Sequence, residues 1–200
     1  MRLSNRSKIL EAAIRVIDRD GVTAVTFDSV AAEAEVTRGG MMYHFKTRDA
    51  LIQAINQHLA DSWEANLLGN AGKPAEEATT DERYAAYVRT SANLATRPEL
   101  LFCLEGAKHP ALTVPWSRLI DSWAAPAPDD IDDPQALARF IARLAADGLW
   151  IYESLSNRPL PVAVRQRVTQ QLNAVFDAAP AGSAEGDAPA QAGKGRRTPR

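Results

Sequence analysis

The sequence contains one cysteine, no long apolar run and almost no excess charge of either sign, with a formal net charge of −2. Cys103 has no second cysteine to pair with, so an internal disulfide is excluded, and this usage is typical of a reducing compartment. No stretch approaches the ~20 apolar residues that a membrane-spanning helix needs. The first residues, MRLSNRSKILEAA, lack the apolar segment of a signal peptide. These absences predict a cytoplasmic protein without a membrane partner.

Common catalytic and metal-binding patterns are also missing. There is no serine–histidine–acid context and no glycine-rich phosphate loop. The separations of His58, Cys103 and His109 match no metal-ligand spacing. The acidic run PDDIDDP lacks the glycine and the terminal glutamate of a calcium-binding loop. We therefore expect no enzymatic activity, no cofactor and no metal.

Apolar residues recur at helical spacing through most of the chain, which predicts an all-α protein of about nine helices. Those between Leu10 and Ile17 fall at i, i+3, i+4 and i+7, and Gly21 is the expected stop. Further helices are expected at about 27–34, 37–44, 47–68 and 81–96, around 101–104 and 116–123, and from about 134 and 161 onward. The second, third and fourth helices are each preceded by a threonine that can cap the helix by accepting a hydrogen bond from a free backbone N–H. These residues are Thr26, Thr37 and Thr47.

Composition divides the chain into three parts. Residues 1–50 hold 8 basic and 7 acidic residues, whereas 51–182 hold 11 basic and 16 acidic residues. This contrast indicates that a polyanion would meet the N-terminal part. The end of the chain is rich in proline, glycine and alanine and has no large apolar residue, so disorder is expected at 181–200. The predicted domains are 1–50 and 51–180, followed by this tail.

The stretch TRGGMMYHFKTR at 37–48 has the spacing of a short helix but carries two adjacent glycines. A glycine inside a helix costs roughly 1 kcal/mol relative to alanine. Two short helices joined by a tight turn, at about 27–34 and 37–44, form a helix-turn-helix whose second helix enters the DNA major groove. Glycines on the groove-facing side would let the backbone approach the bases closely, which explains why helix propensity is sacrificed there.

Residues 7–51 resemble the DNA-binding domain of the TetR family of bacterial regulators. The shared pattern includes an Ile/Leu-rich first helix, a glycine turn, a threonine-capped helix, and a recognition helix that ends in His-Phe. Glu35 departs from the pattern because the family usually has glycine in this turn, which predicts a strained or altered turn. The resemblance implies an N-terminal three-helix helix-turn-helix domain followed by an all-helical ligand-binding and dimerisation domain.

Several residue types around the predicted recognition helix suit DNA contact. Helix N-termini and hydroxyl groups bind phosphates, and arginine pairs with guanine edges. For Met41 the sequence leaves base contact and core packing equally open. The predicted DNA-binding residues are Thr26, Thr37, Arg38, Gly39, Gly40, Met41, Tyr43, His44, Lys46 and Arg48.

The resemblance also implies an internal ligand pocket and a dimer formed by the last two long helices. Aromatic residues beyond the first domain are candidates for the pocket, although ordinary core packing explains them equally well: Trp63, Tyr84, Tyr87, Phe102, Trp116 and Trp123. Steps of four and three predict a tightly packed helical seam, in which Gly148 permits close approach. The predicted interface comprises Leu137, Ile141, Leu144, Gly148, Ile151, Leu155, Val168, Leu172 and Val175.

These observations predict a homodimeric, ligand-responsive repressor that binds a palindromic operator in double-stranded DNA. Its partners would be the operator, a second copy of the chain and an unidentified small-molecule effector. The alternative is a DNA-binding regulator without a small-molecule inducer, controlled by a protein partner or by its own concentration.

Overall fold

The computed structural model describes residues 5–130 and 132–177, and within these ranges the secondary structure is entirely helical. The α-helices are α1 (Asn5–Asp20), α2 (Phe27–Ala34), α3 (Arg38–His44), α4 (Arg48–Ala71), α5 (Thr80–Leu94), α6 (Arg97–Gly106), α7 (Val114–Trp123), α8 (Pro134–Leu155) and α9 (Val162–Asp177). Two short 3-10 helices lie at Val22–Ala24 and Pro110–Leu112. The predicted all-α class is therefore confirmed. None of the described helices is long and apolar enough to cross a membrane. The predicted tail at 181–200 lies outside the described residues.

The first helices begin where their local chemistry predicts. The Thr26, Thr37 and Thr47 side chains each accept a hydrogen bond from the backbone N–H three residues later, which confirms the three predicted caps. Gly21 has a φ of 86°, a left-handed value that glycine adopts without steric cost, and its N–H bonds to the Ile17 carbonyl. Short polar residues and one glycine thus set the length of the N-terminal helices.

Helices α1 to α3 pack with the start of α4 around one hydrophobic core. Met41 on α3 is fully buried in this core, and Phe45 directly after α3 is 4% exposed. The prediction that Met41 contacts DNA is therefore wrong, since its side chain is the anchor that holds α3 on α1 and α2. Phe102, predicted to line a ligand pocket, is 1% exposed in the same core. Its position shows that α6 is packed against the N-terminal domain.

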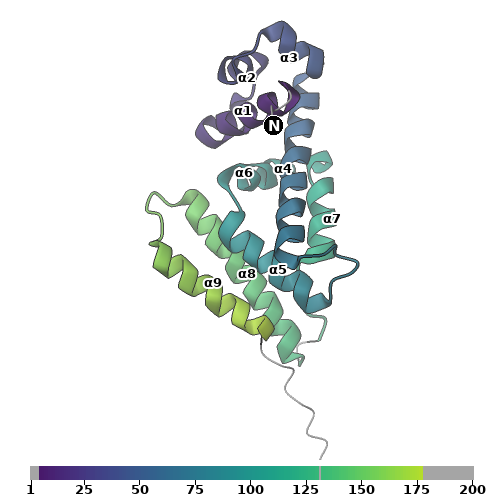
Figure 1. Ribbon diagram of the computed structural model, residues 1–200, viewed down its shortest axis with the longest axis vertical. Helices are drawn as coiled ribbons and strands as arrows, with labels where there is room; N and C mark the ends of the chain where they lie inside the picture. Colours follow the sequence, from purple (N-terminus) through teal and green to yellow (C-terminus); the bar gives the residue numbers. More distant parts are fainter. Residues whose placement is uncertain (1–4, 131, 178–200) are drawn as a thin grey trace, which may run out of the picture.

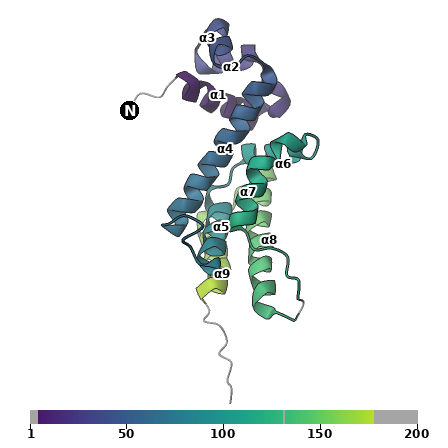
Figure 2. The ribbon, with the colours of Figure 1, turned by 90° about the vertical axis from the view of Figure 1, so that its right-hand side faces the viewer.

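Helix α4 belongs to both halves of the molecule. Leu51 and Ile55 lie in the N-terminal core, whereas Trp63 and Leu67 lie in a second core with α5 and α7. Figures 1 and 2 show α4 running without a break from the α1–α3 unit to the lower helices. The helix therefore links the core that holds α3 with the core formed by α5 and α7.

A third core lies between α5, α8 and α9. Ala142, Ala146 and Leu149 of α8 meet Val88 and Ala92 of α5 there. The three α9 residues predicted for the dimer interface pack against this core within the same chain: Val168, Leu172 and Val175. The three side chains are only partly buried, so their contact with a partner subunit stays a prediction.

The remaining residues of the predicted interface form a stripe on the outer face of α8. Their side chains are between 39% and 62% exposed, and the exposed members are Leu137, Ile141, Leu144, Ile151 and Leu155. Gly148 lies in the same stripe, and a Cβ atom added to it would meet no other atom within 4 Å. We refer to these six residues as the α8 stripe. A contiguous apolar strip of this kind is typical of a surface that a partner covers.

Candidate functional site

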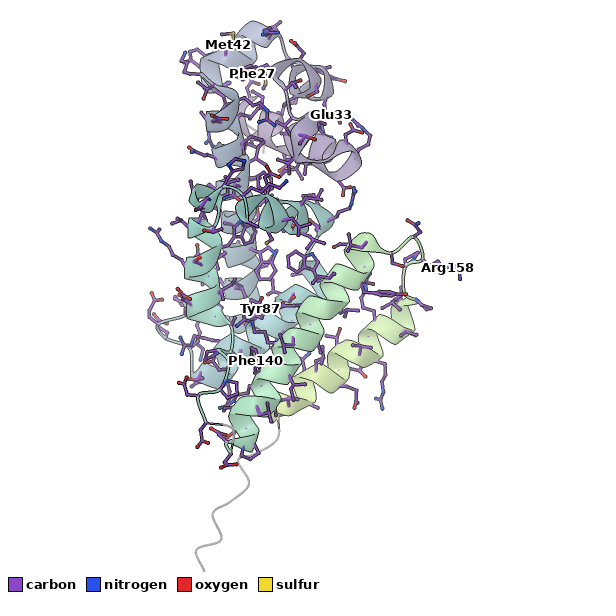
Figure 3. The ribbon with its side chains drawn as sticks, turned by 180° about the vertical axis from the view of Figure 1, so that it is seen from behind. Phe27, Glu33, Met42, Tyr87, Phe140 and Arg158 are labelled. Carbon is purple, nitrogen blue, oxygen red and sulfur yellow. The ribbon has the colours of Figure 1, made fainter. Side chains whose placement is uncertain are left out.

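Helix α3 lies at the end of the molecule that is farthest from α8 and α9. Met42 and Phe27 mark this end in Figure 3. Tyr43 is 77% exposed and Met42 is 47% exposed, so both side chains project from the helix that Met41 anchors. His44 is half-buried, and its ring contacts that of Tyr43 edge to face with 5.1 Å between centroids. The outer face of α3 is therefore free for a ligand as large as a DNA duplex.

The N-terminus of α3 combines a capped helix end with a charged side chain. Thr37 Oγ1 accepts from the Gly40 N–H at 3.1 Å, and Arg38 follows as the first helical residue. Arg38 Nη1 donates to both carboxylate oxygens of Asp28 on α2, at 2.7 and 2.8 Å. Positive charge and free backbone N–H groups at a helix N-terminus favour anions such as phosphate.

The two glycines of α3 differ in how closely the chain packs around them, and only Gly40 has a tight neighbour. A Cβ atom at Gly39 would lie 3.9 Å from Thr37 Oγ1, which is an ordinary contact, and one at Gly40 would lie 3.3 Å from the same atom. Neither glycine has a positive φ. The structure therefore leaves the absence of a side chain at Gly39 without an internal explanation, in agreement with close approach by an external partner.

The turn between α2 and α3 is made by a residue that disfavours it. Glu35 has a φ of 55° and a ψ of 43°, the left-handed conformation that side-chain-bearing residues rarely adopt. Its N–H compensates by bonding to the carbonyls of Ala31 and Ala32. The glutamate at this position thus adopts the backbone conformation that a glycine would take, at some cost in strain.

Two cations follow α3, and their environments differ. Lys46 is exposed and makes no hydrogen bond within the described residues. Arg48 is exposed too, but its Nε donates to the Val25 carbonyl at 2.8 Å and its Nη2 to the Val22 carbonyl at 3.2 Å. These bonds tie its guanidinium to the segment before α2, so its predicted contact with DNA stays a prediction and is left out of the surface proposed below.

Replacing Arg48 with alanine should lower the free energy of unfolding by about 1.5–3 kcal/mol, the usual contribution of hydrogen bonds to a charged group. Chemical denaturation measures this loss. The matched change Lys46→Ala should leave stability unaltered and weaken binding to all DNA sequences alike, with a smaller salt dependence. Equal stability of the two variants would contradict a stabilising role for the Arg48 hydrogen bonds.

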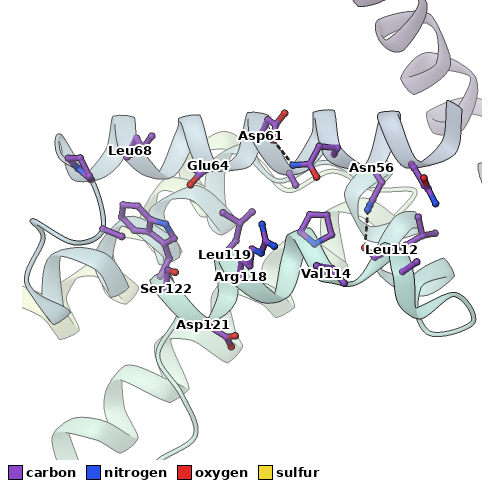
Figure 4. A pocket seen from close by; sticks show the side chains of 18 of the residues that line it. Asn56, Asp61, Glu64, Leu68, Leu112, Val114, Arg118, Leu119, Asp121 and Ser122 are labelled. Atoms are coloured by element: carbon purple, nitrogen blue, oxygen red, sulfur yellow. Dashed lines mark hydrogen bonds between the residues drawn. The ribbon is translucent and has the colours of Figure 1, made fainter. Parts of the chain in front are cut away.

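A groove of about 1130 Å³ separates α4 from α7. Its inner wall includes Ala60, Leu119 and Trp123, which also belong to the second core. Asn56 closes one end, because its amide donates to the Leu112 carbonyl at 2.9 Å and accepts from Trp116 Nε1 at 2.8 Å. Figure 4 shows Asn56 and Leu119 on the facing sides of the two helices.

The groove is mainly acidic. Asp61, Glu64, Glu76 and Asp121 line it together with a single cation, Arg118. Figure 4 shows Glu64 pointing from α4 toward α7 across the groove. Carboxylates beside an apolar wall create a negative potential that attracts cationic ligands.

Apart from Phe102, which lies in the N-terminal core, the aromatic residues predicted to line a pocket divide into two groups. Trp123 lines the groove, and Tyr84 lines a second cavity of about 310 Å³ beside the loop before α8. Trp63, Tyr87 and Trp116 pack together instead, with the Trp63 ring 5.6 Å from Tyr87 and 6.2 Å from Trp116. This cluster lies directly behind the groove, because Trp123 belongs to the same core.

A partly buried carboxylate joins the aromatic cluster to α8. Asp147 accepts hydrogen bonds from Tyr87 and Ser91, each at 3.0 Å. Arg143 lies over the Tyr87 ring and 3.7 Å from Asp147. Burial raises the pKa of Asp147, although the donated hydrogen bonds and Arg143 act in the opposite direction. The network ties α5 to α8 and so fixes the position of the α8 stripe relative to the groove.

Comparison with known proteins identifies the family. Residues 9–55 match the family described as bacterial regulatory proteins, tetR family, and residues 81–177 match a tetracyclin repressor-like C-terminal domain. The HTH-type transcriptional regulator BetI of Burkholderia mallei is 30% identical over 171 residues, which cover 80% of this chain and 87% of that protein. The chain belongs to the TetR family. It is a DNA-binding transcriptional regulator and not an enzyme.

A second relative and two solved structures are also similar to this chain. BetI of Paraburkholderia phymatum is 29% identical over 182 residues, covering 84% of this chain and 90% of that protein. Among solved structures, a putative transcriptional regulator from Saccharomonospora viridis in complex with choline has a TM-score of 0.62. It is 20% identical, and the match covers 86% of this chain and 95% of that chain. A regulator from a Rhodococcus species gives the same TM-score at 19% identity, with 87% and 95% covered. At these identities the two structures support the fold alone.

Some residues of the candidate sites were not predicted from the sequence. Asp28, Asp147 and Glu64 lie on regular helices, where an acidic residue is most often an exposed and solvated one. Nothing in the linear pattern shows that Asp28 meets Arg38, ten residues away. The signal that exists is weak: Asp147 interrupts the apolar face of α8 next to Ala146, which is fully buried.

Proposed function

We propose that this TetR-family chain is a homodimeric repressor that binds a palindromic operator. An organic cation would be the effector that causes it to dissociate from the operator. The DNA-reading surface comprises the predicted residues that remain at the exposed end of the molecule: Thr26, Thr37, Arg38, Gly39, Gly40, Tyr43, His44 and Lys46. Two copies joined through the α8 stripe would present two α3 helices to successive major grooves, as dimeric helix-turn-helix proteins do.

The observation that carries the effector proposal is the acidic groove on α4. The helix that supplies Asp61 and Glu64 to the groove also contributes its other end to the N-terminal core that holds α3. A ligand that separates α4 from α7 would therefore alter the spacing of the two α3 helices in a dimer. This coupling requires that the ligand bind the released form more tightly than the DNA-bound form.

The charge of the groove defines the effector class. Its carboxylates outnumber its one arginine, and the apolar side chains of Ala60 and Leu119 lie beside them in the wall. The Saccharomonospora viridis regulator, similar in fold, has been solved with choline, a quaternary ammonium compound. A small cation with an apolar body is the effector that fits these features.

Titration with choline, followed by tryptophan fluorescence and by release of bound DNA, tests the proposal. The neutral isostere 3,3-dimethyl-1-butanol should have little effect. Glu64→Gln should weaken choline binding about 2- to 5-fold, as expected for an exposed ion pair, whereas Glu77→Gln outside the groove should not. If choline and other organic cations neither bind nor release DNA, the proposed effector is wrong and control by a partner or by concentration is favoured.

A further inference from the structure

The Asp28–Arg38 pair joins the two helices of the DNA-reading unit. Asp28 lies in the first turn of α2, and Arg38 is the first residue of α3. The contact involves one guanidinium nitrogen, because Nη1 donates to both carboxylate oxygens at 2.7 and 2.8 Å. Within the described residues, Arg38 Nε and Nη2 donate to no other group. Asp28 therefore holds the Nη1 group of Arg38, and the edge formed by Nε and Nη2 is free.

Stability does not explain this pair. The side chains are 60% and 71% exposed, and ion pairs in such positions contribute little to folding. A carboxylate on a DNA-facing surface also repels phosphates and lowers affinity for DNA of any sequence. A role in DNA recognition would explain why Asp28 stands beside Arg38.

We infer that Asp28 is a positioning residue that orients Arg38 for guanine. With Nη1 held by Asp28, Nε and Nη2 remain as a pair of donors that matches O6 and N7 of guanine. Asp28 also neutralises the charge through which Arg38 would bind phosphates of any sequence. The inference rests on the proposed placement of α3 in the major groove.

The expected effect follows from the single side-chain conformation in which Asp28 holds Arg38. Arginine has many rotamers, and fixing them only when DNA binds would weaken the specific contact about 2- to 10-fold. Asp28→Ala should therefore reduce discrimination between guanine and other bases by this factor. The same change should strengthen binding to unrelated DNA, because a negative charge has been removed.

The experiment selects a randomised duplex DNA pool with the full-length protein and sequences the retained fragments. The variants are Asp28→Ala, Arg38→Ala, the double variant and Glu35→Ala. Glu35 is the matched control, since it lies in the turn between α2 and α3 and its carboxylate makes no hydrogen bond among the described residues. Affinities for the selected sequence and for a scrambled duplex are then measured, and thermal melting confirms that each variant is folded.

The inference requires three results. Asp28→Ala loses guanine discrimination at one position per half-site, Glu35→Ala keeps it while gaining affinity for scrambled DNA, and the double variant resembles Arg38→Ala. Unchanged or improved discrimination in Asp28→Ala would overturn the inference alone, because Asp28 would then be a simple helix-end charge or would hold Arg38 away from the bases. A wild-type protein that enriches no motif would instead overturn the proposed function, and the inference with it.

Discussion

Changing Ile141 and Leu144 to glutamate should convert the protein into monomers and abolish tight operator binding. Both side chains are more than half exposed in the isolated chain, so their replacement leaves the fold of the subunit intact. In a dimer the α8 stripes would pack against each other, and each buried Ile or Leu side chain contributes about 1.5–3 kcal/mol. Four glutamates placed in that interface would also bring like charges together without solvent. We expect a loss of dimer affinity of at least about 1000-fold, from two such contacts on each subunit.

Analytical ultracentrifugation measures the change in mass, and DNA binding is followed in parallel. Leu104→Glu is the matched control, because Leu104 on α6 is 58% exposed and lies outside the α8 stripe. Gly148→Leu provides a second test, since a Cβ atom added at this position would meet no atom of its own subunit within 4 Å. A dimer that persists in both α8 variants would show that another surface joins the subunits.

Changes at the two glycines of α3 should separate stability from DNA binding. Gly39→Ala places a methyl group where it meets only an ordinary contact at 3.9 Å, and it adds helix propensity. We expect the free energy of unfolding to rise by up to about 1 kcal/mol. Operator affinity should nevertheless fall by at least about tenfold, because a methyl group between helix and bases prevents close approach. Gly40→Leu should abolish specific binding while the protein remains folded.

Melting curves and operator titrations on the same samples give both quantities. Gly69→Ala on α4 is the control, because a Cβ atom there would meet no atom within 4 Å and the position lies away from α3. It should stabilise the protein and leave DNA binding unaltered. Normal operator binding by Gly40→Leu would show that the glycines have no part in recognition.

The helix boundaries were largely predictable from the sequence because they depend on nearby residues. Thr26, Thr37 and Thr47 each satisfy a backbone N–H three positions away, and Gly21 adopts a φ that its neighbours could not. Such interactions involve one turn of chain, so the local pattern contains all the information they need. The unusual turn at Glu35 was predictable for the same reason, because it depends on which residue stands at that one position.

The orientation of individual side chains was decided by tertiary packing. Met41 and Met42 are neighbours of the same type, yet one is fully buried and the other is 47% exposed. Only the position of α1 and α2 against α3 distinguishes them. Arg48 likewise meets the Val22 and Val25 carbonyls more than twenty residues earlier in the chain, a contact that no spacing rule contains.

The surfaces proposed for function also divide into features that the local sequence sets and features that tertiary packing sets. The sequence by itself determined that a helix-turn-helix unit is present, that α8 carries an apolar stripe and that the chain is helical throughout its described parts, because periodicity and capping are local. Only the tertiary structure decided that Val168 and Leu172 of α9 face inward, that Glu64 lines an acidic groove and that Asp28 holds Arg38. These outcomes depend on which helices pack together, and packing joins residues that are distant in the chain.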